Sequence, residues 1–106
     1  MQAASLAEAI LLTERSGLDR ERSLEVLNNG APGSPLIKTL SARITSRSCD
    51  VNFLLRLMKK DLEYATGEAQ AHGIGFNMGT AAANILDQAS GKVGRKDFSA
   101  VVEALR

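Results

Sequence analysis

Apolar side chains recur every three or four residues along most of the chain, which is the spacing of one face of an α-helix. This spacing predicts helices at about 2–16, 20–28, 53–72 and 78–90, one that starts at residue 35, and a short one from residue 97. No stretch alternates apolar and polar residues for long enough to favour a strand. The expected fold is therefore all-α, a single compact bundle of about six helices.

The ends of these helices are marked by residues that commonly occupy such positions. Polar residues and one proline mark the starts, and glycines, which tolerate the left-handed conformation, mark the ends. The expected starts are at Asp19, Ser34 with Pro35, Asn52 and Asp97, and the expected ends are at Gly17, Gly73 and Gly91.

The length and composition are those of a one-domain globular protein, so we expect a single domain over residues 1–106. Apolar residues make up 44% and charged residues 24% of the chain, and no apolar run approaches the about 18 residues of a membrane span. The start, MQAASLAEAILL, lacks the basic region of a signal peptide. We therefore expect a cytoplasmic protein that does not enter a membrane.

Charge and residue types exclude several kinds of site. A net charge of +1, with scattered basic residues and a single tyrosine, does not favour nucleic-acid binding. One cysteine, Cys49, and one histidine, His72, cannot supply the four protein ligands of a usual zinc site. The glycines in GIGFNMG follow no predicted strand, so they do not form a dinucleotide fingerprint. No metal site is expected.

The stretch LLRLMKKDLEYA, residues 54–65, places a carboxylate among apolar residues. On a helix, Asp61 lies on the same face as Leu57, Met58 and Leu62, so this pattern predicts that it is buried. An unpaired buried carboxylate costs several kcal/mol, so Asp61 must have partners. We expect these to be backbone amides at another helix start, for example the one at Ser34, where the helix dipole favours a negative charge.

Lys60 lies at the edge of the same stripe, three residues after Leu57 and four before Tyr64, while Lys59 lies toward the opposite flank. The commoner role for such a lysine is a solvated surface residue. From this edge, however, the amine of Lys60 could also reach into a cleft.

Four segments together resemble the C-terminal helical domain of the β-hydroxyacid dehydrogenases, the family of 3-hydroxyisobutyrate dehydrogenase and tartronate semialdehyde reductase. The most specific is the F-x-x-x-L-M-x-K-D-L pattern from Phe53 to Leu62. The four segments are AEAILLTERSGLD (7–19), VLNNGAPGS (26–34), NFLLRLMKKDLEYA (52–65) and RKDFSAVVEAL (95–105). The similarity therefore covers nearly the whole chain.

This resemblance implies a part of an oxidoreductase that transfers hydride between NAD or NADP and a small hydroxyacid. In such enzymes a Rossmann domain binds the cofactor, and a G-x-x-x-K-x-x-N-N segment carries the catalytic lysine. Both are expected to be absent from this chain. The chain would then supply part of the substrate cleft and of a homo-oligomer contact, with no catalytic residue, no cofactor bound by itself and no activity alone.

The resemblance also implies roles for particular residues. Lys60 would contact the cofactor near its nicotinamide end, and Asp61 would position that wall of the active site. The turn NNGAPGS and the following helix would contribute Asn29, Ser34 and Pro35 to the substrate pocket. Pro35 replaces an aromatic residue that is common in the family, which leaves the hydroxyacid open, and the choice between NAD and NADP depends on the absent domain.

A second hypothesis keeps the fold but not the chemistry. In it the chain is a stand-alone helical module that pairs with a partner, or with itself, through an exposed first helix.

Overall fold

The computed structural model describes residues 1–31, 33–46, 50–51 and 53–106. These residues form six α-helices and one short 3₁₀ helix, and no strand occurs among them. The elements are α1 (Gln2–Arg15), α2 (Arg20–Asn29), α3 (Pro35–Ser46), α4 (Leu55–Ala71), α5 (Asn77–Val93), η1 (Phe98–Ala100) and α6 (Val101–Leu105). The predicted all-α bundle is therefore confirmed.

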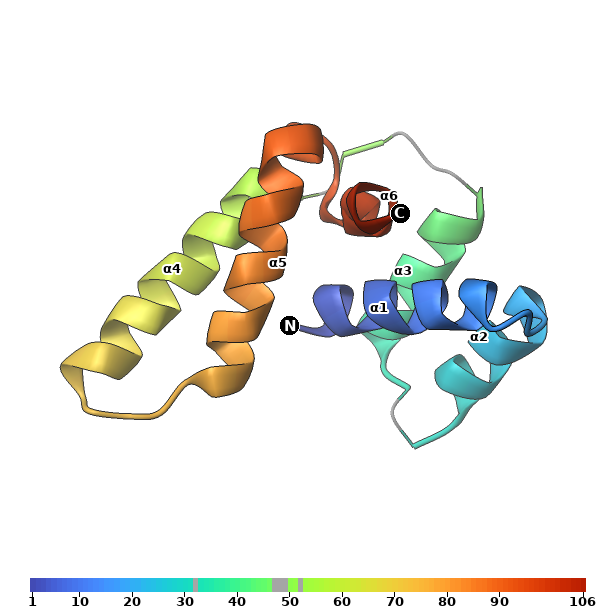
Figure 1. Cartoon of the computed structure of the whole chain (residues 1–106), viewed down its shortest axis with the longest axis horizontal. Helices are drawn as coiled ribbons and strands as arrows, with labels where there is room; N and C mark the ends of the chain where they lie inside the picture. The colour runs from blue at the N-terminus through green and yellow to red at the C-terminus, as the bar shows by residue number, and fades with distance from the viewer. Residues whose placement is uncertain (32, 47–49, 52) are drawn as a thin grey trace.

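Helices α4 and α5 pack side by side as an antiparallel hairpin at one end of the molecule, and α1, α2 and α3 lie at the other end (Figure 1). The short α6 lies between the two groups and packs on both α1 and α5. Because α4 lies at the outer edge of the hairpin, one of its faces packs on α5 while the opposite face is directed away from the bundle.

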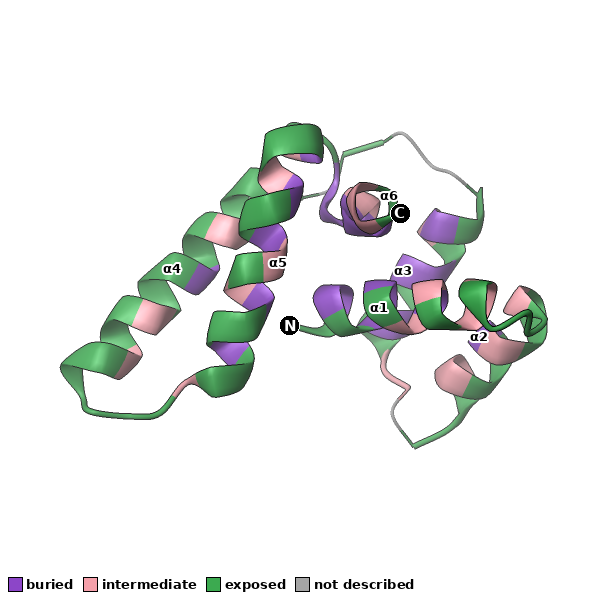
Figure 2. Ribbon diagram, viewed as in Figure 1, coloured by how far each residue is buried: buried purple, intermediate pink, exposed green. Residues whose placement is uncertain are grey.

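A single core joins the two ends of the molecule (Figure 2). The largest fully buried side chains come from five different helices: Ile10, Leu40, Leu55, Leu86, Val101 and Val102. Helix α1 buries alanines as well as Leu6 and Ile10, and these small residues let it approach its neighbours closely. One face of α1 packs against its neighbours while Leu12, on another face, stays 70% exposed, so the pairing that the second hypothesis assigns to this helix stays a prediction.

Two predicted helix starts are confirmed in detail. The Asp19 side chain accepts a hydrogen bond from the Arg22 backbone N–H, at 3.1 Å, and caps α2. The Ser34 hydroxyl accepts one from the Ile37 N–H, also at 3.1 Å, and α3 begins at Pro35. These caps satisfy amide groups that have no partner within their own helix.

Two predicted helix ends are also confirmed, and one is wrong. Gly17 and Gly73 follow α1 and α4 with φ angles of 73° and 65°, which favour glycine. Helix α5, by contrast, continues through Gly91 to Val93. Val93 is buried in the core, so packing of the last turn outweighs the modest cost of a glycine inside a helix.

The start of α4 differs from the prediction. Asn52, the expected cap, lies outside the described residues, and the helix begins at Leu55 rather than near residue 53. The residues just before it run beside the segment that precedes η1. The Leu55 N–H donates to the Lys96 carbonyl at 2.9 Å, and the Phe98 N–H donates to the Phe53 carbonyl at 2.8 Å. These bonds fix where α4 begins.

A buried carboxylate, Asp97, joins these segments. It is only 4% exposed, and its Oδ1 accepts from the Phe53 N–H at 3.1 Å while Oδ2 accepts from the Ser99 hydroxyl at 2.6 Å and N–H at 3.0 Å. The Arg43 Nε of α3 lies 3.3 Å from Oδ2, as an ion pair rather than an aligned hydrogen bond. Arg43 also donates through Nη2 to the Asp50 carbonyl. One acid therefore connects α3, the start of α4 and η1.

Asp61 is not buried, so that prediction is wrong. The face of α4 that packs on the bundle contains Leu55, Met58 and Leu62, and is rotated about a quarter of a turn from the predicted one. Asp61 and Leu57 are exposed. The expected contact with the amides at the start of α3 is also wrong, since Asp61 makes no hydrogen bond or ion pair with any described residue.

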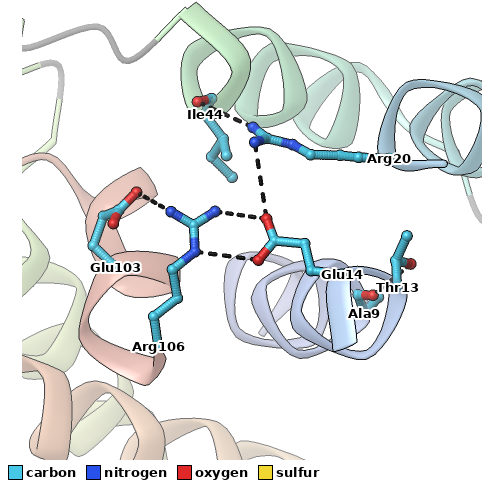
Figure 3. Close-up of polar contacts among 7 residues, drawn as sticks. All are labelled: Ala9, Thr13, Glu14, Arg20, Ile44, Glu103 and Arg106. Carbon is cyan, nitrogen blue, oxygen red and sulfur yellow. Dashed lines mark hydrogen bonds and ion pairs between the residues drawn. The ribbon is translucent and has the colours of Figure 1, made fainter. Parts of the chain in front are cut away.

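A second polar network, drawn in Figure 3, ties α6 to the other helices. The Arg106 guanidinium binds both carboxylate oxygens of Glu14, at 2.7 and 3.3 Å, and lies 2.7 Å from Glu103. The hydrogen bond with Glu14 raises the pKa of Arg106 above its ordinary value. Arg20 lies 3.8 Å from Oε1 of Glu14, the oxygen that is 2.7 Å from Arg106, and donates to the Ile44 carbonyl at 3.5 Å. Because its members are partly exposed, this network contributes modestly to stability.

Substitution of Asp97 and of Asp61 tests directly that the first is buried and paired and the second is not. Replacing Asp97 with asparagine should lower the free energy of unfolding by roughly 3 kcal/mol, because Arg43 then stays largely buried without its carboxylate. Asp61→Asn is the matched control and should change it by less than about 0.5 kcal/mol. Urea unfolding followed by circular dichroism measures both, and a larger loss for Asp61→Asn than for Asp97→Asn would contradict the assignment.

Candidate functional site

Four exposed residues at helical spacing form a stripe that we call the outer face of α4: Leu57, Lys60, Asp61 and Tyr64. Leu57 is 42% exposed and Tyr64 is 65% exposed. Figure 2 shows the surface of α4 away from α5 as mostly exposed. The outer face thus combines apolar surface with one ammonium and one carboxylate.

The start of this face is held by an aromatic contact. The rings of Phe53 and Phe98 meet edge to face, with centroids 6.1 Å apart and planes at 80°. Phe98 is buried, while Phe53 remains partly exposed just before α4 begins. The core therefore anchors the segment from which the outer face extends.

The two adjacent lysines have different surroundings. The Lys59 Nζ lies 2.7 Å from Asp87 of α5 and 3.6 Å from Glu63, which is one helical turn further along α4. The hydrogen bond with Asp87 raises the pKa of Lys59 above its ordinary value. Lys59 therefore helps to hold α4 against α5, and its charge is matched by two carboxylates.

Lys60 has no such partner. Among the residues that the structure describes, it forms no ion pair, and its Nζ lies over the ring of Tyr64 at 5.7 Å from the centroid. An aromatic face attracts a cation without neutralising it. Lys60 is thus an exposed, uncompensated positive charge in the middle of the outer face of α4.

The predicted substrate-pocket residues lie elsewhere. Asn29 ends α2 and lines an open groove of about 590 Å³ between α2 and α3. Inside this groove the buried Ser41 hydroxyl donates to the Asn28 side chain at 3.1 Å. Ser34 donates to the Gln2 side chain at 3.0 Å. These bonds hold the groove and the helix start in shape.

The turn between α2 and α3 depends on a glycine. The Gly33 N–H donates to the Gly30 carbonyl at 3.0 Å, and a Cβ at position 33 would lie 2.2 Å from the Asn28 carbonyl oxygen. No side chain fits there without a shift of the backbone. The close approach of Gly33 to Asn28 therefore sets where the following residues, Ser34 and Pro35, lie.

The structure does not bring all the predicted site residues together. Lys60 and Asp61 share the outer face of α4, whereas Asn29, Ser34 and Pro35 lie around the turn between α2 and α3, in the other group of helices (Figure 1).

Metal-binding clusters and membrane spans are two further kinds of feature that bear on function. Within the described ranges, no three or more histidine, cysteine, aspartate or glutamate side chains are grouped so as to hold a metal ion. No helix in the described part of the chain is long and apolar enough to cross a membrane.

Comparisons with known proteins identify the family. Residues 1–105 match the family model described as "NAD-binding of NADP-dependent 3-hydroxyisobutyrate dehydrogenase". The chain belongs to this family. The resemblance to the β-hydroxyacid dehydrogenases is therefore confirmed.

Two curated relatives come from Arabidopsis thaliana. Glyoxylate/succinic semialdehyde reductase 2, described as chloroplastic, is 34% identical over 105 residues, which are 97% of this chain and 29% of the relative. Glyoxylate/succinic semialdehyde reductase 1 is 28% identical over 103 residues, which are 96% of this chain and 36% of the relative. The chain spans about a third of the length of these relatives.

Two solved structures share the fold. The 3-hydroxyisobutyrate dehydrogenase of Salmonella typhimurium superposes with a TM-score of 0.89 at 23% identity, over 96% of this chain and 36% of that one. The enzyme of Mycobacterium tuberculosis, solved with L-serine, gives a TM-score of 0.86 at 26% identity, over 99% of this chain and 38% of that one. The helical arrangement described above is therefore that of a known dehydrogenase domain.

The different surroundings of the two lysines predict different reactivity. At pH values below the pKa of Lys59, less of its amine is deprotonated than in an ordinary lysine, so an acylating reagent should modify Lys59 more slowly than Lys60. Removing the partner, in Asp87→Asn, should speed the modification of Lys59 and leave Lys60 unchanged. Peptide mass spectrometry measures both rates, and equal rates in the unmodified sequence would contradict the assigned ion pairs.

Proposed function

We propose that these residues form the helical domain of an NAD(P)-dependent oxidoreductase that acts on a small hydroxyacid or the corresponding semialdehyde. In this proposal the outer face of α4 is one wall of the cleft that holds cofactor and substrate. The observation that carries it is Lys60, an exposed charge without an ion-pair partner among the described residues. The family match over residues 1–105 and the reductase names of the relatives support it.

The outer face suits a nicotinamide dinucleotide. Such a cofactor carries negatively charged phosphates and flat rings, and this face offers the Lys60 ammonium beside the exposed apolar surfaces of Leu57 and Tyr64. When bound, the cofactor supplies the hydride. The residues of this chain attract and orient it and exclude water from one side.

Asp61 has a proposed role of a different kind. It lies next to Lys60 on the outer face but is exposed, so it does not act as a buried anchor. We assign it the positioning of this wall through hydrogen bonds to groups outside the chain. The carboxylate accepts from any N–H or O–H that the cleft brings to α4.

We assign the substrate end of the cleft to a second copy of the chain. Asn29, Ser34 and Pro35 belong to α2, α3 and the connection between them, in the group of helices at the other end from α4, so we propose that they contact the substrate as residues of the partner in a homo-oligomer. A site shared between copies is a common reason for symmetric assembly to be essential to activity. The catalytic lysine and the dinucleotide-binding domain belong to the proposed enzyme as a whole, and these 106 residues alone are expected to be inactive.

The proposed cofactor is NAD or NADP. The cytoplasm is the proposed compartment, although one relative is described as chloroplastic.

The alternative is a helical interaction module without catalytic activity. The exposed Leu57 and Tyr64 on α4 favour it, because apolar surface of this kind also promotes association. In that case the outer face of α4, rather than α1, would bind the partner. Association of the chain that survives Lys60→Ala and does not respond to cofactor would support the module.

Hydride transfer by the complete gene product that contains these residues tests the proposal. We expect reduction of glyoxylate or succinic semialdehyde, or oxidation of 3-hydroxyisobutyrate or serine, followed through the absorbance of NADH or NADPH. Lys60→Ala should raise the KM for the cofactor roughly tenfold or more, because a charge-assisted contact is lost.

Lys59→Ala is the matched control, since it removes the same charge from the neighbouring position. Its charge is already paired with Asp87 and Glu63, so its KM should change less than about twofold. Equal effects of the two substitutions, or no hydride transfer with any of these compounds, would contradict the proposed function.

A further inference from the structure

We propose that Tyr64 is a positioning residue for Lys60, whose ring holds the ammonium in place for an anionic group of the dinucleotide while leaving its charge unneutralised. This inference rests on the proposed function, because it concerns the same face of α4. The contact that carries it is the 5.7 Å separation between the Lys60 Nζ and the centroid of the Tyr64 ring.

The two adjacent lysines of α4 supply an internal comparison. Residues four positions apart on a helix face each other, so a glutamate four positions after a lysine can pair with it. Lys59 has Glu63 at that position and pairs with it at 3.6 Å. Lys60 has Tyr64 there instead. The chain thus places an aromatic ring where the neighbouring lysine has a carboxylate.

The choice of partner decides whether a lysine can bind an anion. A carboxylate fixes the side chain but cancels its charge, so an incoming phosphate would have to break the ion pair first. An aromatic face attracts the ammonium through its quadrupole and leaves the net charge intact. The Tyr64 ring therefore restrains the Lys60 side chain and leaves its charge uncompensated. The carboxylates of Glu63 and Asp87 restrain Lys59 and compensate its charge.

Holding the side chain in advance also lowers the cost of binding. A lysine on a surface helix samples many rotamers and loses this freedom when it contacts a ligand. The tyrosine ring, which has only two rotatable bonds, limits the positions that Lys60 occupies before the ligand arrives. Binding then fixes fewer degrees of freedom, which favours affinity.

The test compares three substitutions at position 64 in the complete gene product. Tyr64→Leu keeps the apolar surface but removes the π face, so the KM for the cofactor should rise about two- to fivefold, with a smaller effect on kcat. Tyr64→Phe keeps the ring and should restore the original KM. Tyr64→Glu places a carboxylate four positions after Lys60, as Glu63 is placed for Lys59. Because this carboxylate compensates the charge of Lys60, the substitution should raise the KM for the cofactor more than Tyr64→Leu does.

Two controls make the effect specific to Lys60. Glu63→Gln alters the neighbouring pair with Lys59 and should leave the KM for the cofactor unchanged. Tyr64→Leu added to Lys60→Ala should cause no further rise, since leucine keeps the apolar surface and the aromatic ring acts through the lysine.

A direct readout of the contact is the magnetic shielding of Lys60. The Hε protons should resonate upfield of those of other lysines in the unmodified protein and in Tyr64→Phe, and this shift should vanish in Tyr64→Leu. Retention of the shift in Tyr64→Leu would overturn the inference.

The kinetic outcomes separate this inference from the proposed function. If Lys60→Ala raises the KM but Tyr64→Leu does not, or if Tyr64→Phe is as impaired as Tyr64→Leu, the positioning role is overturned and the proposed function stands. If Lys60→Ala itself leaves the KM unchanged, the proposed function is overturned, and the positioning role with it.

Discussion

The buried contact between Asp97 and Arg43 ties three separate segments of the chain together beside the core that joins the two ends of the molecule. Through one carboxylate, the side chain of α3 meets the backbone of Phe53 and the first residues of η1. Helix α6, which packs on both α1 and α5, and the shared core hold the α4–α5 hairpin against the other helices, and Asp97 fixes where α4 begins. The outer face of α4 is directed away from the bundle because the opposite face, with Leu55 and Leu62, packs inward.

Local signals in the sequence were sufficient for most helix boundaries but not for the faces of the helices. Asp19 and Ser34 cap helices through hydrogen bonds within four residues, so the sequence contains all that is needed to predict them. The burial of Asp61 was predicted wrongly because Leu57 and Leu55 are equally apolar, and only tertiary packing shows that Leu55 is the buried one. The role of Asp97 as a buried acid depends on Arg43, more than fifty residues earlier, which no local pattern indicates.

For the candidate site too, some features could be predicted from the sequence and others required the structure. Lys60 could be singled out from the sequence, because its motif resembles that of the β-hydroxyacid dehydrogenases and its spacing differs from that of Lys59. Its lack of an ion-pair partner among the described residues required the structure, since Asp87 comes from another helix and pairs with Lys59 alone. The placement of α2 and α3 in another group of helices than α4 is likewise a property of the tertiary fold, and it is the reason for proposing a site that two copies share.

A crystal structure of the complete gene product with NADP⁺ bound tests the central claim, that the outer face of α4 is a wall of the cofactor cleft, most directly. The account predicts the Lys60 Nζ about 3 Å from a polar or anionic group of the dinucleotide, with the Tyr64 ring still beside the ammonium. A dinucleotide bound elsewhere, with the outer face of α4 in solvent or packed on a second copy of the chain, would contradict it.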